Sequence, residues 1–220
     1  MRSRLLALTL LATLSLVGCT SSAPEAAPSP TTAPSTATPT PTPAQPVAAG
    51  LVVRGGGIEL YDSDATLIGS FLWSDETAEA LAVLELAFGP APVPGVREGD
   101  GSHYPDYDTY DFGGFVYGTA VGISKPRTEE FLPSWVNVTT GSPINGVSIY
   151  TVDGLHVGTP LEQVLALLAD PGLTRPAWQG TAYLFDPVDP TRNSNTVSPV
   201  VDESGVVVLI DAPRFSGETA

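Results

Sequence analysis

The chain has 220 residues, with nine Lys and Arg against twenty-four Asp and Glu, and a formal net charge of −15. A protein this acidic repels nucleic acid and anionic lipid headgroups, so neither is an expected partner. The single cysteine excludes an internal disulfide. The two histidines have no metal-site spacing, so we expect no zinc site and no cofactor.

Residues 1–18 have the build of a signal peptide, with Arg2 and Arg4 before an apolar stretch at residues 5–17. That stretch is shorter than the roughly 20 residues that cross a bilayer. The run Leu16-Val17-Gly18-Cys19 resembles the bacterial lipoprotein signal, in which an aliphatic and a small residue precede a lipidated cysteine.

This resemblance implies cleavage before Cys19 and attachment of lipid chains such as palmitate to its thiol. The protein is then expected to be extracytoplasmic and anchored to the cell membrane. Loss of the two signal arginines would leave seven basic residues and a net charge of −17. An ordinary secreted protein with an incidental cysteine is the alternative.

Residues 19–48 are predicted to be a lipidated cysteine followed by a disordered linker. Residues 20–48 hold eight Pro and seven Thr and no aromatic residue, too little apolar surface to offset the entropy of ordering. We interpret this tract as a spacer. An O-glycosylated stalk and a ligand for Pro-binding domains are the alternatives.

Three short strands are predicted next, at residues 51–53, 58–61 and 67–73, with turns at residues 55–57 and 62–64. Trp73 is expected in the core. A helix follows, for which Ser74 is the predicted N-cap. Leu81, Leu84 and Phe88 form its predicted buried stripe, and Gly89 ends it.

A hairpin is predicted at residues 110–117, with Gly113-Gly114 at its turn. The spacing Thr159-Pro160-Leu161-Glu162 predicts a capping box at the start of a second helix. Its predicted stripe is Leu161, Val164, Leu165 and Leu168, and its predicted end is Asp170-Pro171-Gly172. Further strands are predicted at residues 181–185 and 206–210, the latter after a turn at residues 202–205.

The two helices suggest an internal repeat of about eighty-four residues, since residues 81–84 and 165–168 read LAVL and LALL. The stretch at residues 157–164, with Asp170-Pro171-Gly172 after it, resembles the modules of the outer-membrane lipoprotein SmpA/OmlA family and of the beta-lactamase inhibitory protein. The resemblance implies an α+β fold in which one helix packs on antiparallel strands, in tandem modules at residues 49–135 and 136–220. Their shared or abutting antiparallel sheet would serve binding rather than chemistry. The chain lacks the paired cysteines of the inhibitory protein.

The segment at residues 100–111 holds four Asp and three Tyr. Asp106, Asp108 and Asp111 are weak candidates for a cation site, although their spacing is not that of an EF-hand. Tyr104, Tyr107 and Tyr110 are candidate ligand contacts. We interpret the segment as an acidic loop leading into a strand, with Tyr110 and Phe112 on its buried face, and as the expected contact surface.

Trp135 and Trp178 lie in Pro-bounded segments, where they are candidate anchors of a protein interface, although packing on a sheet is the commoner fate of such a ring. His103 could act as a base beside Asp106 or Asp108, but no Gly-x-Ser-x-Gly motif accompanies it. His156 is expected to be half-buried. No catalytic residue is identified.

The sequence therefore predicts a lipid-anchored protein with a non-catalytic domain that binds an envelope protein or glycan. The alternative is a secreted or surface hydrolase, or an inhibitor-type protein, acting at the cell envelope.

Overall fold

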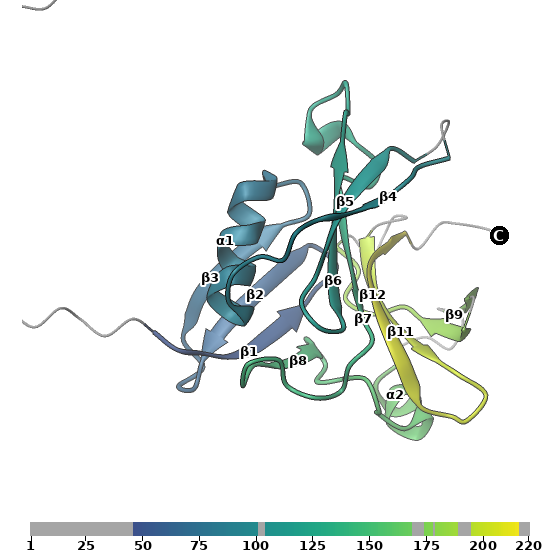
Figure 1. Cartoon of the computed structure of the whole chain (residues 1–220). Helices are drawn as coiled ribbons and strands as arrows, with labels where there is room; N and C mark the ends of the chain where they lie inside the picture. The colour runs from purple at the N-terminus through teal and green to yellow at the C-terminus, as the bar shows by residue number, and fades with distance from the viewer. Residues whose placement is uncertain (1–45, 101–103, 169–173, 178, 189–194, 216–220) are drawn as a thin grey trace, which may run out of the picture. The chain divides into compact units, whose positions relative to one another are not determined.

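Two β-sheets enclose the main core, and each takes strands that lie far apart in the sequence (Figure 1). The computed structural model describes residues 46–100, 104–168, 174–177, 179–188 and 195–215, which all belong to one unit, Ala44–Ala220. The predicted signal peptide, most of the predicted linker, Cys19, His103, Trp178 and Asp170-Pro171-Gly172 lie outside the described residues.

The smaller sheet has four strands in the order β3-β2-β1-β8. Strand β1 is antiparallel to β2 and parallel to β8. The three strands predicted after the linker are confirmed as β1, β2 and β3. The turn after β2 is fixed by Asp62, whose Oδ1 accepts the N–H groups of Asp64 and Thr66 at 2.9 and 2.8 Å. The four strands are β1 (Ala48–Val53), β2 (Gly57–Asp62), β3 (Leu67–Leu72) and β8 (Ser148–Thr151).

Helix α1 (Thr77–Phe88) follows β3 and packs against it. The helix and its end at Gly89 are confirmed, but the prediction that Ser74 caps its start is wrong. Glu76 holds the N-cap position without a side-chain cap bond. The acidic residue beside it, Asp75, instead accepts the N–H of Leu72 at 2.7 Å, so its carboxylate closes the end of β3 rather than the start of the helix.

The larger sheet has eight antiparallel strands in the order β4-β5-β6-β7-β12-β11-β10-β9. The predicted hairpin is confirmed as β5 and β6. Gly113 and Gly114 both have the positive φ that its turn requires, and Asp111 Oδ1 accepts the backbone N–H groups of both glycines. The strands are β4 (Gly95–Arg97), β5 (Asp106–Asp111), β6 (Phe115–Val121), β7 (Ser134–Val138), β9 (Thr174–Ala177), β10 (Gly180–Tyr183), β11 (Asn195–Val201) and β12 (Val207–Phe215). A short 3-10 helix, η1 (Arg127–Glu129), lies between β6 and β7.

This strand order has a two-fold pattern. Helix α1 precedes the four strands β4 to β7, and helix α2 (Leu161–Leu167) precedes the four strands β9 to β12. The two four-stranded sets join where β7 pairs with β12, and the predicted module boundary at residue 135 falls inside β7. Strand β8, however, comes from the second predicted module and pairs with β1 of the first, so both sheets take strands from both modules.

Helix α2 differs from its prediction at its start and along its stripe. Its N-cap position is Pro160, and it has no side-chain cap bond, so the predicted capping box is wrong. The Thr159 hydroxyl accepts the N–H of His156 at 3.0 Å instead. Val164 is the buried residue of the helix, whereas Leu165 is 51% exposed, so the predicted four-residue buried stripe is also wrong at that position.

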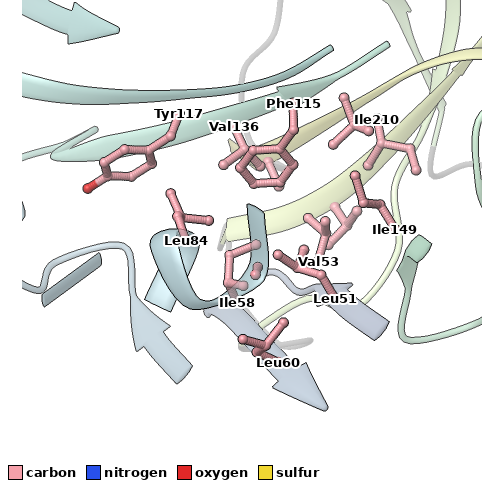
Figure 2. Packing of buried hydrophobic residues seen from close by; sticks show 14 of the residues in the cluster. Leu51, Val53, Ile58, Leu60, Leu84, Phe115, Tyr117, Val136, Ile149 and Ile210 are labelled. Carbon is pink, nitrogen blue, oxygen red and sulfur yellow. The ribbon is translucent and has the colours of Figure 1, made fainter. Parts of the chain in front are cut away.

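The main core lies between the two sheets and α1. Figure 2 shows Leu51 and Ile58 of the smaller sheet facing Phe115 and Val136 of the larger sheet, with Leu84 of α1 beside them. All five side chains are fully buried. The α+β class is thus confirmed in a form dominated by strands, with two sheets and two short α-helices. Among the described residues, no helix has the length and apolar character needed to span a bilayer.

Candidate functional site

The two faces of the eight-stranded sheet have different surroundings. Along β7, Val136 and Val138 point into the main core, and the alternate residues Trp135 and Asn137 line a groove on the opposite face. The groove has a volume of about 510 Å³, and it extends over the β7–β12 junction, with lining residues from β4 on one side to β9 on the other. That size is typical of a site for a small molecule or a short peptide segment.

The aromatic part of the groove floor is packed from below. Trp135 is 6% exposed, and its indole lies over Gly118, where a Cβ atom would fall 2.2 Å from the ring. The Tyr107 ring meets the Trp135 ring edge to face, with 6.0 Å between centroids. The Tyr107 hydroxyl donates to the Leu132 carbonyl at 3.0 Å. Burial raises the pKa of Tyr107 to about 12.

Arg97 covers the exposed side of this aromatic cluster. Its guanidinium carbon lies 5.1 Å from the centroid of the Trp135 ring, within the range of a cation–π contact. Arg97 ends β4, the short edge strand, and it is itself exposed. Because Gly118 lies under the indole and Arg97 lies over it, neither face of Trp135 is open for stacking a sugar ring.

The centre of the floor is polar. Asn137 of β7 and Asp211 of β12 are cross-strand partners, and the Asn137 amide donates to Asp211 Oδ1 at 2.9 Å. Arg214 lies next to this pair, with its Nη1 3.8 Å from Asp211 Oδ2 and its Nη2 donating to the Pro176 carbonyl at 3.2 Å. The amide of Asn137, held by β7, thus orients a carboxylate that belongs to the other half of the sheet.

The rim carries exposed aromatic rings. Tyr104 is 39% exposed and Phe131 is 47% exposed, and both line the groove on the side of β5. Aromatic side chains are enriched at protein interfaces, in which a few of them contribute most of the binding energy.

The structure brings some of the predicted contact residues together and separates others. Tyr104, Tyr107 and Trp135 all line the groove. Tyr110 points to the other face of β5, where it stacks on Tyr117 at 6.3 Å and packs against the main core together with Phe112, as predicted. Burial raises the pKa of Tyr110.

The three predicted cation ligands do not converge. Asp106 and Asp108 share one face of β5, and Asp111 lies on the opposite face because strand side chains alternate. Asp106 accepts the N–H of Gly99 at 2.9 Å, and Asp111 is engaged by the hairpin turn. The segment at residues 106–111 is a strand rather than a loop. The described residues contain no group of three His, Cys, Asp or Glu side chains placed to bind a metal.

The groove residues that were not identified from the sequence include Arg97, Phe131, Asn137, Asp211 and Arg214. The alternation in Ser134–Val138, in which Trp135 and Asn137 occupy one face, was a signal that could have indicated a two-faced strand. His156, expected to be half-buried, is exposed, and its Nδ1 lies 2.9 Å from the Val157 carbonyl.

A second hollow lies on the outer face of the four-stranded sheet. Glu59 of β2 joins its polar side chains, because one of its oxygens accepts from both Arg54 Nε and the Tyr61 hydroxyl at 2.8 Å. Arg54 is therefore already paired within the protein.

Searches against protein-family models, curated proteins and solved structures return no match for the chain. The groove itself therefore carries the functional argument. Its described residues offer an arginine held against an indole, an oriented carboxylate and two exposed aromatic rings, a combination suited to recognising a protein segment.

Proposed function

We propose that the chain is a lipid-anchored extracytoplasmic protein whose folded unit binds a protein partner of the cell envelope, without catalysis, through the groove of the eight-stranded sheet. The observation that carries the proposal is the groove over the β7–β12 junction, with Arg97 on the packed Trp135 and with Tyr104 and Phe131 on its rim. Trp, Tyr and Arg are the residues that most often dominate binding at interfaces.

A protein partner fits the groove better than a glycan. Sugar binding by aromatic residues uses an open ring face, whereas the two faces of Trp135 are covered by Gly118 and Arg97. The exposed rings belong to the rim, at Tyr104 and Phe131, where they can surround an inserted segment of a partner. We therefore favour an envelope protein over a glycan.

The anchor rests on the signal in the sequence. Lipid chains on Cys19 would tether the folded unit to the membrane, and the Pro/Thr tract would hold its groove away from the headgroups. Cys19→Ser is expected to abolish lipid labelling and to release or stall the precursor. Normal processing and membrane retention of this variant would contradict the anchor.

The inhibitor-type alternative has one observation in its favour. The two halves of the larger sheet each follow a helix, contain four antiparallel strands and join through β7 and β12. This pattern supports the proposal that they derive from one duplicated module, and it agrees with the shared binding sheet that the inhibitory-protein resemblance implies. An enzyme recovered as the partner, with its activity lowered by the wild-type chain, would select this alternative.

The experiment is affinity capture from native envelope with the full-length lipidated chain. Wild type is compared with Phe131→Ser, which removes an exposed ring from the groove rim, and with Leu72→Ser, which removes an exposed apolar side chain from the four-stranded sheet. We expect one stoichiometric partner with wild type and Leu72→Ser, and strong loss with Phe131→Ser. Equal recovery by all three chains would contradict the groove as the binding surface.

A further inference from the structure

The groove contains an arginine whose guanidinium pairs with no oxygen of the described residues. Among the described arginines, Arg54 pairs with Glu59, Arg127 donates to the Asp75 and Pro133 carbonyls, Arg175 donates to the Thr174 carbonyl, and Arg214 contacts Asp211. Arg97 is the exception in the described part of the chain, because its guanidinium contacts the Trp135 ring and forms no hydrogen bond or ion pair there.

The surroundings of Arg97 make this arrangement specific. The chain carries a net charge of −15, and the residue next in sequence, Glu98, is acidic and also lines the groove, yet it does not pair with Arg97. The guanidinium is held on the indole instead. The guanidinium carbon lies 5.1 Å from the centroid of the ring, and the five N–H groups of the guanidinium are a fixed set of donors that matches a planar acceptor.

We propose that Arg97 is the anchor of the groove for an acidic side chain, an Asp or Glu in a segment of the protein partner, which it binds as a two-bond carboxylate pair. This inference rests on the proposed function and adds to it the chemistry of the bound segment. A carboxylate fits because Arg–carboxylate pairs form two parallel charge-assisted hydrogen bonds. Contact with the Trp135 ring restricts the Arg97 guanidinium before binding, which lowers the entropy cost of forming the Arg–carboxylate pair.

The acidic character of the rest of the chain limits which partner segments can bind at Arg97. Its negative field disfavours partners with many acidic residues, and the attraction of Arg97 acts only within its own short range. A single carboxylate among neutral or basic residues is therefore the preferred occupant. Tyr104 and Phe131 would contact the neighbouring side chains of that segment from the rim.

The test uses the full-length chain in detergent and two mixed pools of capped tetrapeptides. Both pools are randomised at three positions, and the second position is Glu in one pool and Gln in the other. NMR follows the Nε–H resonance of Arg97 and the indole N–H of Trp135 during titration. We expect half-saturation by the Glu pool at a concentration about ten-fold lower than by the Gln pool, because only Glu offers a charged acceptor.

Three variants define the outcome. Arg97→Gln should reduce the preference for Glu to less than about two-fold. Arg97→Lys should leave an intermediate preference, because lysine keeps the charge but lacks the planar set of guanidinium donors. The matched control Arg54→Gln should keep the full preference. Equal binding of both pools, no shift of the groove resonances, or a preference that survives in Arg97→Gln would each overturn the inference. The proposed function stands in those cases if partner capture still depends on Phe131.

Discussion

The two faces of the eight-stranded sheet are built from the same strands but are used differently. On β7, Val136 and Val138 are fully buried against the four-stranded sheet, and Trp135 and Asn137, one residue away, line the groove. The inner face is continuous with the main core and contributes stability. The groove face is held together by a stacked arginine and an amide–carboxylate pair. Changes on the inner face should therefore have the largest effect on stability, and changes of the exposed groove residues should affect binding.

The largest expected effect is on the inner face. Phe115 is fully buried, and its ring lies 5.1 Å from that of Phe88 of α1. Phe115→Ala should lower the free energy of unfolding by about 3–5 kcal/mol, since it leaves a cavity between the sheets. Denaturant unfolding measures the loss. A cost below about 1 kcal/mol would show that this face is not the main source of stability.

The next effect lies on the groove face, beneath Trp135. Gly118→Ala places a Cβ atom 2.2 Å from the Trp135 indole, so the ring must move away from the sheet. We expect a loss of about 1–3 kcal/mol from this overpacking, together with a shift in tryptophan fluorescence. A variant with the stability and the emission of wild type would show that Trp135 is not packed on Gly118.

Tyr107→Phe tests the groove floor with a smaller change. Loss of the hydrogen bond to the Leu132 carbonyl should cost about 0.5–1.5 kcal/mol at neutral pH. Because burial raises the pKa of Tyr107 to about 12 in the folded protein, the unfolded chain loses this proton first as the pH rises above 10. The contribution of Tyr107 is therefore present below pH 10 and is lost as the pH rises towards 12.

Unfolding curves at several pH values check this sign. The difference in stability between wild type and Tyr107→Phe should shrink between pH 10 and 12. A difference that grows in this range would contradict the assigned burial of the phenol.

The smallest expected effect on stability belongs to Arg97. Arg97→Gln removes an exposed cation–π contact, worth about 0.5–1 kcal/mol. Its control, Arg54→Gln, breaks the partly exposed ion pair with Glu59 on the other sheet, and surface pairs are worth about 0.2–1 kcal/mol. The two variants should have nearly the same melting curves. They should differ in their preference for Glu peptides over Gln peptides. A large melting shift for Arg97→Gln alone would indicate a structural role.

Local patterns predicted the local elements. The alternation in β1 to β3 and the Gly113-Gly114 turn of the β5–β6 hairpin depend on residues close in sequence, and these elements were found. Strand β11 was not predicted, and it contains Pro199, a residue that is unusual inside a strand. The β10–β11 ladder is in fact interrupted there, between the Ala182–Val200 pair and the Phe185–Val197 bridge.

The errors at the helix starts have a common cause. Capping rules assume that a side chain near a helix start serves that helix. The helix that follows Ser74 begins two residues later than a Ser74 cap requires, with Glu76 at its N-cap position, and the Thr159 hydroxyl bonds to the N–H of His156. The groove was inaccessible to sequence patterns for a different reason. Asn137 and Asp211 are seventy-four residues apart, and they meet only because β7 pairs with β12.

Site-specific photo-crosslinking in intact cells tests the central claim most directly. A benzoylphenylalanine residue replaces Phe131 on the groove rim of the full-length lipidated chain, or Leu72 on the four-stranded sheet as the matched control. We predict one discrete adduct from position 131 and none of that mass from position 72. No adduct at position 131, or the same adduct from both positions, would contradict the assignment of the groove as the partner-binding surface.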